Sequence, residues 1–425
     1  MPRNIYDLSH FEFSAGQVGR LQTLACIPII AGDSIELNMQ GIWRQSALRR
    51  NLTVDAHVDN FAFFVPHRHI YGDDWINFIK QGTDETVTFS TINLGAEEID
   101  YIASGSATGV LPLWRFAGYN RIWNRYFRAP TDVTAELSDT DFGTGDSNRK
   151  QFGQLCGRIK TPWTSGINAT VDASDREAST AGNVLDILDL ERVRARYRTE
   201  QQRDWFNQRY TDLLEDVFGG FANADADERP TLIKRQHHML SGYDVDGTDA
   251  AALGTYSGKS VGTCGLSFPR RFFPEHGALW IMTLMRYPTI HEEEVHYLDK
   301  KSQPTYLEIA ADPQLWEAEP PHEIQVQDFF KGTDSSSLGT VPYGQWYRYH
   351  PSHVHRLYDA LDGFTFIASI PGNQDQARYV RNNDYNNVYQ TTQLGDWQVQ
   401  ARIGVTAHRA VPTVLESIFA GATNS

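Results

Sequence analysis

The sequence predicts an all-β protein, one antiparallel β sandwich with long insertions between its strands. Residues 397–408 alternate between apolar and polar side chains, the pattern of a strand with one buried face and one face in water. Residues 278–287 form an apolar run that ends at Pro288, as in a strand buried in a core. Long Gly-, Ser-, Thr- and Asp-rich stretches lie between such segments, and a jelly roll tolerates them because its connections lie at the ends of short strands.

Two further strand regions lie near the N-terminus. Residues 21–39 are rich in β-favouring side chains and are interrupted by Ala31-Gly32-Asp33, which indicates a turn or bulge. In residues 55–65 the pattern alternates and becomes apolar on both faces towards Val65. We therefore predict one domain, 1–425, with core strands near 21–66, 268–288 and 378–409, and insertions at about 67–265 and 290–375. Within the first insertion, a 3.6-residue period of apolar side chains predicts a helix over 184–218.

The composition is that of an ordinary globular chain, with 40% hydrophobic and 21% charged residues. Aromatic residues make up 12%, which suits either a large β core or extensive contacts with neighbouring chains. The formal net charge of −15 excludes a protein that coats nucleic acid with its whole surface, because phosphate binding needs a basic excess. Any such contact must use a local basic patch or a more basic partner.

The cysteines predict folding in a reducing compartment. Cys26, Cys156 and Cys264 are odd in number and widely spaced, and the sequence contains no Cys-x-x-Cys. The first residues, 1–7, lack the apolar core of a signal peptide. Both features favour the cytoplasm as the place of folding.

One pattern suggests a metal-dependent enzyme. His67 and His69, with Asp73 four residues further on, resemble the His-x-His and acid of cupins, which are also jelly rolls. However, Phe61 stands where cupins have a glycine, and no second cupin motif follows. Solvated or hydrogen-bonded histidines are the more ordinary interpretation, and the cupin-like enzyme is the alternative hypothesis.

A second pattern resembles the start of a calcium loop. Asp244, Asp246 and Asp249 surround Gly247, an arrangement that suits Ca²⁺ or Mg²⁺. Thr255 stands where such a loop needs its last glutamate, so a turn stabilised by aspartate side chains is the simpler interpretation. We expect no cofactor beyond such a structural cation.

Basic and aromatic side chains supply the other candidate sites. Arg49-Arg50, followed by Asn51, is the basic pair best suited to contact DNA phosphates, and Arg20 is a further candidate; surface salt bridges are the alternative. The insertions also carry aromatic residues of the kind that anchor protein interfaces, and the candidates are Trp316, Trp346 and Tyr347. The sequence shows neither a Gly-x-Ser-x-Gly motif nor a convincing catalytic cysteine, so we expect no enzyme.

Several stretches, in order along nearly the whole chain, resemble the major capsid protein of the microviruses, small icosahedral phages with single-stranded DNA. They are residues 7–10, 15–21, 30–34, 48–50, 65–72, 241–249, 269–277 and 344–349, for example Val65-Pro66-His67-Arg68-His69-Ile70-Tyr71-Gly72 and Pro269-Arg270-Arg271-Phe272-Phe273-Pro274. The resemblance weakens at about 83–110, 131–180 and 350–356, and at the extreme C-terminus.

The resemblance implies an eight-stranded antiparallel viral jelly roll that forms pentamers and a closed icosahedral shell. It implies assembly in the cytoplasm of a bacterial host with internal and external scaffolding proteins. Further implied partners are a spike protein, a small basic DNA-associated protein, the packaged single-stranded DNA and a host lipopolysaccharide glycan. The acidic chain agrees with a cationic companion beside the DNA.

Overall fold

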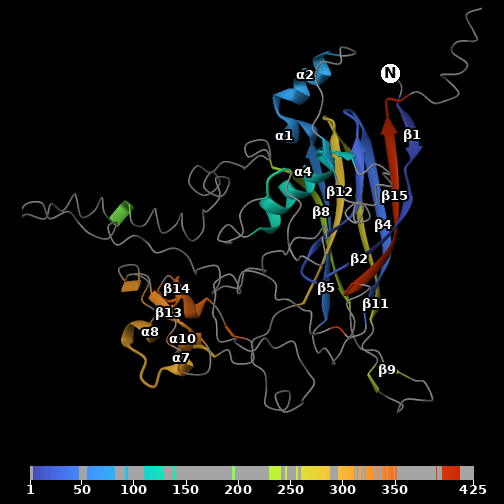
Figure 1. Ribbon diagram of the computed structural model, residues 1–425. Helices are drawn as coiled ribbons and strands as arrows, with labels where there is room; N and C mark the ends of the chain where they lie inside the picture. Colours follow the sequence, from blue (N-terminus) through green and yellow to red (C-terminus); the bar gives the residue numbers. More distant parts are fainter. Residues whose placement is uncertain are drawn as a thin grey trace, which may run out of the picture.

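The protein is described here from a computed structural model (Figure 1). The structure describes residues 3–46, 55–81, 91–93, 110–128, 137–139, 194–196, 229–240, 245–246, 255–256, 260–287, 295–310, most positions of 312–351, 389 and 395–411.

Two antiparallel sheets dominate this part of the chain. The first has the order β1-β15-β4-β11, with β2 also paired to β15; its strands are β1 (Asn4–Asp7), β2 (His10–Gly16), β4 (Ser34–Gln45), β11 (Val261–Phe272) and β15 (Trp397–Arg409). The second has the order β3-β12-β5-β8, and its strands are β3 (Leu21–Ile29), β5 (Ala56–Pro66), β8 (Thr231–Leu240) and β12 (Gly277–Arg286). Segments from both ends of the chain thus lie side by side, as Figure 1 shows for blue β1 and red β15.

The strand order is that of a jelly roll. The first and last strand regions of the chain are neighbours in one sheet, and the antiparallel pair β5 and β8 lies at an edge of the other. β1 pairs with residues 406–409 of β15 and β2 with residues 397–403, so two short strands share one sheet edge. The all-β jelly-roll prediction is confirmed, whereas the count of eight is not, because the two sheets described here contain nine strands.

The core lies between the sheets and contains alternate side chains of each strand. In β15 the buried side chains include Val399, Ala401, Ile403 and Val405, as the alternation predicted. The predicted turn at Gly32 separates β3 from β4, and its φ of +90° lies in the left-handed region that favours glycine. The four strand regions predicted at 21–39, 55–65, 278–287 and 397–408 are all present.

The second sheet is buried on both faces. Its outer face is covered by α4 (Trp114–Ile122) and by the π-helical turn η1 (Trp123–Phe127), which pack on Phe61, Phe63 and Trp280. This cover explains why nine consecutive residues of β12 are buried. The apolar character of both faces near Val65 therefore has a cause beyond the sandwich core, namely a helix from an insertion.

The range 67–265, expected to be an insertion, needs correction. It contains β8 and the first residues of β11, which are strands of the two sheets. β8 escaped prediction because it is an edge strand with the polar sequence Lys234-Arg235-Gln236-His237-His238, most of which faces water. Of the helix predicted over 184–218, the structure describes residues 194–196, which are helical; residues 378–396 of the predicted last core region are described at 389, 395 and 396.

The insertions add small elements. After β5 come α1 (His67–Tyr71), α2 (Asp73–Gln81) and the hairpin of β6 (Thr91–Asn93) with β7 (Val110–Pro112). β9 (Val245–Asp246) pairs with β10 (Thr255–Tyr256). Beyond β12 lie α7 (Tyr297–Lys300), α8 (Tyr306–Ala310), β13 (His322–Gln325), α10 (Val326–Phe329), β14 (Ser337–Val341) and the turn η5 (Gln345–Tyr347), drawn in orange beside the sandwich in Figure 1. We call residues 295–351 the second insertion.

Candidate functional site

The three aromatic interface candidates lie together in the second insertion. Trp346 is only 1% exposed, and its ring stacks on Tyr297 with centroids 4.4 Å apart. Trp316 is half-buried and donates its indole N–H to the Leu307 carbonyl at 2.8 Å. Tyr347, 46% exposed, lies on the surface of this cluster. Trp346 is therefore a core residue of the insertion, and Tyr347 is the candidate that a neighbouring chain can reach.

A buried carboxylate supports this aromatic cluster. Glu308 accepts hydrogen bonds from the Tyr297 hydroxyl at 3.0 Å and from the Thr305 amide at 2.7 Å, and Lys301 lies 3.2 Å away. Burial raises the pKa of Glu308, but these hydrogen bonds and the lysine outweigh it and hold the pKa at about 2. The carboxylate thus stays ionised and fixes α7 to α8.

Around it the surface is apolar, with exposed Tyr306, Ile309, Leu315 and Tyr347; we call these four residues the α8 patch.

The basic candidates are only partly described. Arg20 directly precedes β3, next to Gly19, which donates its backbone N–H to the Met285 carbonyl at 2.8 Å. Arg49 and Arg50 lie outside the described residues. Their contact with DNA stays a prediction.

The cation candidates are described only at Asp246, whose backbone belongs to β9; Asp244 and Asp249 lie outside the described residues. Within the described ranges, no three His, Cys, Asp or Glu side chains gather closely enough to hold a metal ion. A structural Ca²⁺ or Mg²⁺ at this loop stays a prediction.

The histidines of the cupin-like alternative serve a structural purpose. His67 is buried at the start of α1 between Trp75 and Trp114, with ring centroids 4.9 Å and 5.2 Å away. His69 is also buried, whereas Asp73 is exposed at the start of α2. The aromatic rings around His67, rather than a metal, account for its position.

We expect His67 to make the protein acid-sensitive. Burial, with a smaller contribution from His276, lowers the pKa of His67 from 6.5 to about 4. Because the unfolded chain takes up this proton first, stability should be full above pH 6.5 and fall as the pH drops towards 4, by about 3 kcal/mol in total. Measured by urea unfolding, the free energy of unfolding of His67→Gln should fall less between pH 6.5 and pH 4 than that of the wild type. His408→Gln should show the same pH dependence as the wild type. Equal slopes in all three proteins would contradict the assignment.

A charged cluster that sequence reasoning missed lies on the outer face of the second sheet. Asp59 is completely buried, and its Oδ1 accepts hydrogen bonds from Arg235 (Nη2, 3.0 Å) and from Nδ1 of His237 at 3.0 Å. Its Oδ2 accepts from Arg286, and His57 contacts His237 with a distance of 3.1 Å between Nδ1 and Nε2. We call these five residues the Asp59 cluster. No local motif signals it, because its members come from β5, β8 and β12.

The pKa of Asp59 reflects two opposing effects. Burial raises it, but the Arg286 charge and the hydrogen bonds from Arg286, His237 and Arg235 outweigh burial, so the pKa is lowered. Asp59 is therefore ionised at neutral pH.

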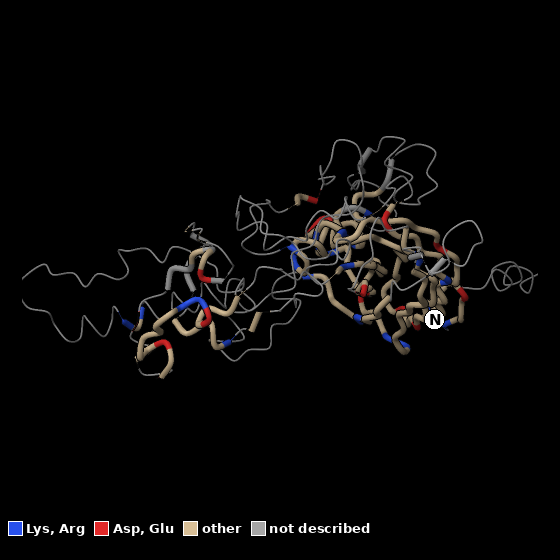
Figure 2. Tube along the Cα trace, turned by 90° about the horizontal axis from the view of Figure 1, so that it is seen from below, with Lys and Arg blue, Asp and Glu red and all other residues tan. Residues whose placement is uncertain are grey.

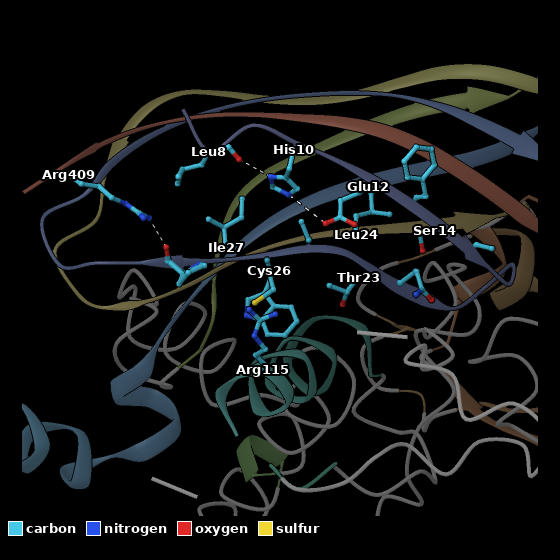
Figure 3. Close-up of a pocket in the computed structure, with 16 residues that line it drawn as sticks. Leu8, His10, Glu12, Ser14, Thr23, Leu24, Cys26, Ile27, Arg115 and Arg409 are labelled. Atoms are coloured by element: carbon cyan, nitrogen blue, oxygen red, sulfur yellow. Dashed lines mark hydrogen bonds and ion pairs between the residues drawn. The ribbon is translucent and has the colours of Figure 1, made fainter. Parts of the chain in front are cut away.

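A pocket of about 580 Å³ lies along the open edges of β2 and β3. Figure 3 shows His10 and Glu12 of β2 on one side, Cys26 of β3 opposite, and Arg115 of α4 below it. His10 lies 2.8 Å from the Leu8 carbonyl (Nδ1) and 3.6 Å from Glu12 (Nε2). Burial raises the pKa of the Cys26 thiol to about 12, so the pocket holds no activated nucleophile.

Comparison with known proteins shows the family of this chain. The family model described as "Capsid protein (F protein)" matches residues 1–182 and 173–419. Capsid protein F of Escherichia phage G4 is 38% identical over 417 residues, 97% of each chain. The chain belongs to the capsid protein F family. Capsid protein F of Enterobacteria phage phiK and that of Escherichia phage alpha3 are 38% and 39% identical over 424 residues, 98% of this chain and 97% of each relative.

Membership of the capsid protein F family confirms the microvirus resemblance and identifies a structural virion component rather than an enzyme. The cupin-like alternative has no support, and His67, His69 and Asp73 are not a catalytic set. Among the described helices, none has the length and apolar character needed to cross a membrane. In Figure 2 basic and acidic positions are interspersed over the sandwich.

Proposed function

We propose that this capsid protein F forms pentamers that close into an icosahedral shell around single-stranded DNA. The observation that carries the proposal is the match to capsid proteins F over nearly the whole chain. Exposed apolar side chains support it: the α8 patch in the second insertion, and Ile5, Phe11, Phe13, Ile42 and Val261 on the first sheet. Such surfaces mark interaction sites in soluble proteins, and a shell needs several unlike contacts that close.

The proposal includes the partners that the microvirus resemblance implies. They are internal and external scaffolding proteins, a spike protein, a small basic protein beside the DNA and a host lipopolysaccharide glycan, with assembly in the bacterial cytoplasm. The net charge of −15 supports the basic companion, because an acidic shell needs cations next to packaged phosphates. Arg20, Arg49 and Arg50 are proposed DNA contacts, and Asp244, Asp246 and Asp249 a proposed Ca²⁺ or Mg²⁺ loop.

Sedimentation velocity with electron microscopy tests assembly. The chain, expressed alone and with its phage companions, should form pentamers or closed shells of uniform diameter. A monomer at every concentration, even with the companions present, would overturn the proposal.

Tyr347 provides a sharper test of the α8 patch. Because Tyr347 is exposed, Tyr347→Ala should change the free energy of unfolding by less than about 1 kcal/mol. If the patch is a subunit contact, the protein concentration needed for assembly should rise at least about tenfold, as for an interface anchor. Trp346→Ala is the contrasting variant, since loss of this buried ring should cost about 3–5 kcal/mol of folding stability. Normal assembly of Tyr347→Ala would exclude the patch as an interface.

A further inference from the structure

The geometry of the Asp59 cluster points to a proton-linked phosphate site: we propose that Arg235 and His57 bind the phosphodiester backbone of single-stranded DNA, and that His57 takes up a proton when they do. This inference rests on the proposed enclosure of DNA and adds a second location to Arg20, Arg49 and Arg50. It differs from those candidates because it requires a change in protonation.

The hydrogen bonds fix the tautomers of both histidines. Ionised Asp59 can only accept, so the nitrogen of His237 that contacts it, Nδ1, carries a hydrogen. In a neutral ring the other nitrogen, Nε2, must then accept, and its partner at 3.1 Å is Nδ1 of His57, which therefore donates. Nε2 of His57 is left with a lone pair, which repels a phosphate oxygen. A proton at this atom turns it into a donor to that oxygen.

The charges that face His57 nearly cancel, so a proton on His57 sets the net charge of the site. They are Asp55, which directly precedes β5, Asp59 of β5, His237 of β8 and Arg286 of β12. Arg235 of β8 adds one more positive charge beside Asp59. With neutral histidines the two arginines and two aspartates balance, so a proton taken up with the anion gives the site the net positive charge that holds it. Burial, His237 and Arg286 lower the pKa of His57 against the pull of the aspartates, so the ring is neutral at pH 7 until an anion arrives.

Arg235 is the residue of the cluster that a phosphate can reach first. Its side chain is 52% exposed, and only Nε and Nη2 of its five-donor guanidinium bind Asp59. The guanidinium lies 5.7 Å from the centre of the Phe61 ring, which holds it over the sheet. Asp59 accepts through both oxygens within the cluster, so it positions the basic groups while a ligand meets their free donors.

The neighbourhood favours nucleic acid over a protein carboxylate. β8 and the two residues before it carry Arg229, Lys234 and Arg235, a local basic strip in a chain of net charge −15. Arg229 lies over Tyr126, with 5.7 Å between its guanidinium carbon and the ring centre, so aromatic rings accompany the cations along the strip. Basic side chains interleaved with aromatics are typical of surfaces that follow a single-stranded backbone.

The test measures binding of a fluorescent 20-residue oligothymidylate to the purified full-length protein. Wild-type affinity should rise by about tenfold from pH 8 to pH 6, because binding is linked to one proton. His57→Gln should remove this rise, whereas His408→Gln, a histidine on the opposite sheet, should keep it. Calorimetry in buffers of different ionisation enthalpy should show proton uptake by the wild type and none by His57→Gln.

Arginine variants locate the contact. Arg235→Gln should weaken binding about fivefold and reduce the slope of log affinity against log salt by about 0.7, as expected for one lost contact to a single strand. Arg402→Gln, which removes an exposed cation of the first sheet, should change neither quantity. Arg235→Lys should restore the salt slope because it restores the charge. Circular dichroism at each pH verifies that all variants are folded.

Three outcomes would overturn the inference: wild-type binding by Arg235→Gln, pH-independent binding by the wild type, or equally tight binding of a polyglutamate peptide. Equally tight binding of polyglutamate would indicate that the Asp59 cluster binds an acidic protein partner. Shell formation is scored separately by electron microscopy. If no shells form, the proposed function fails although the oligonucleotide site stands; if Arg235→Gln and wild type form shells with equal DNA content, the site fails although the function stands.

Discussion

Replacing Asp59 with Ala should lower the free energy of unfolding by about 3–5 kcal/mol, because it leaves Arg286 nearly buried without its counter-charge. Arg286 is only 12% exposed, and Asp59 is its ion-pair partner across β5 and β12. The loss should appear in urea unfolding as a lower midpoint with an unchanged slope.

Two variants test this explanation. Asp59→Leu combined with Arg286→Met removes both charges and should recover at least half of the loss, since apolar replacements of a buried ion pair are often neutral or stabilising. Asp139→Ala removes the partner of Arg121 at a more exposed pair and should cost less than about 1 kcal/mol. If Asp59→Ala were as mild as Asp139→Ala, the cluster would have no structural importance.

Trp280→Ala should be comparably destabilising, by about 3–5 kcal/mol, because it opens a cavity between the second sheet and the helix that covers it. Trp280 is buried in β12, and its ring lies against Gly118 of α4, where an added Cβ would come within 2.7 Å of the indole. The same contact predicts that Gly118→Ala forces the helix or the ring to move, at a cost of about 1–3 kcal/mol.

The measurement is thermal and urea unfolding of Trp280→Ala, Trp280→Phe and Gly118→Ala. Trp280→Phe keeps an aromatic ring and should cost less than half as much as Trp280→Ala. An equal cost for both would show that the cavity is not the cause. Full stability of Gly118→Ala would contradict the close approach of α4 to β12.

The strands whose side chains follow a simple rule could be predicted from the amino-acid pattern alone. Residues 397–408 alternate because one face of β15 packs in the core and the other meets water, and 278–287 are apolar because both faces of β12 are covered. The jelly roll and the capsid family could be inferred because such strands and motifs occur in order along the chain. The acidic composition likewise excluded a general nucleic-acid coat.

The edge strand β8, the division of the aromatic residues between core and surface, and the Asp59 cluster depend on contacts between distant parts of the chain. β8 is an edge strand, so its side chains need not be apolar and its sequence carries no periodic signal. Trp346 and Tyr347 are adjacent in the sequence, yet the first is core and the second surface, because the stacking partner Tyr297 lies almost fifty residues away in the chain. The Asp59 cluster joins three strands whose pairing depends on register, and a shift of one residue would place Asp59 on the other face. Local patterns report the environment of a strand, whereas charged clusters and interfaces depend on which strands meet.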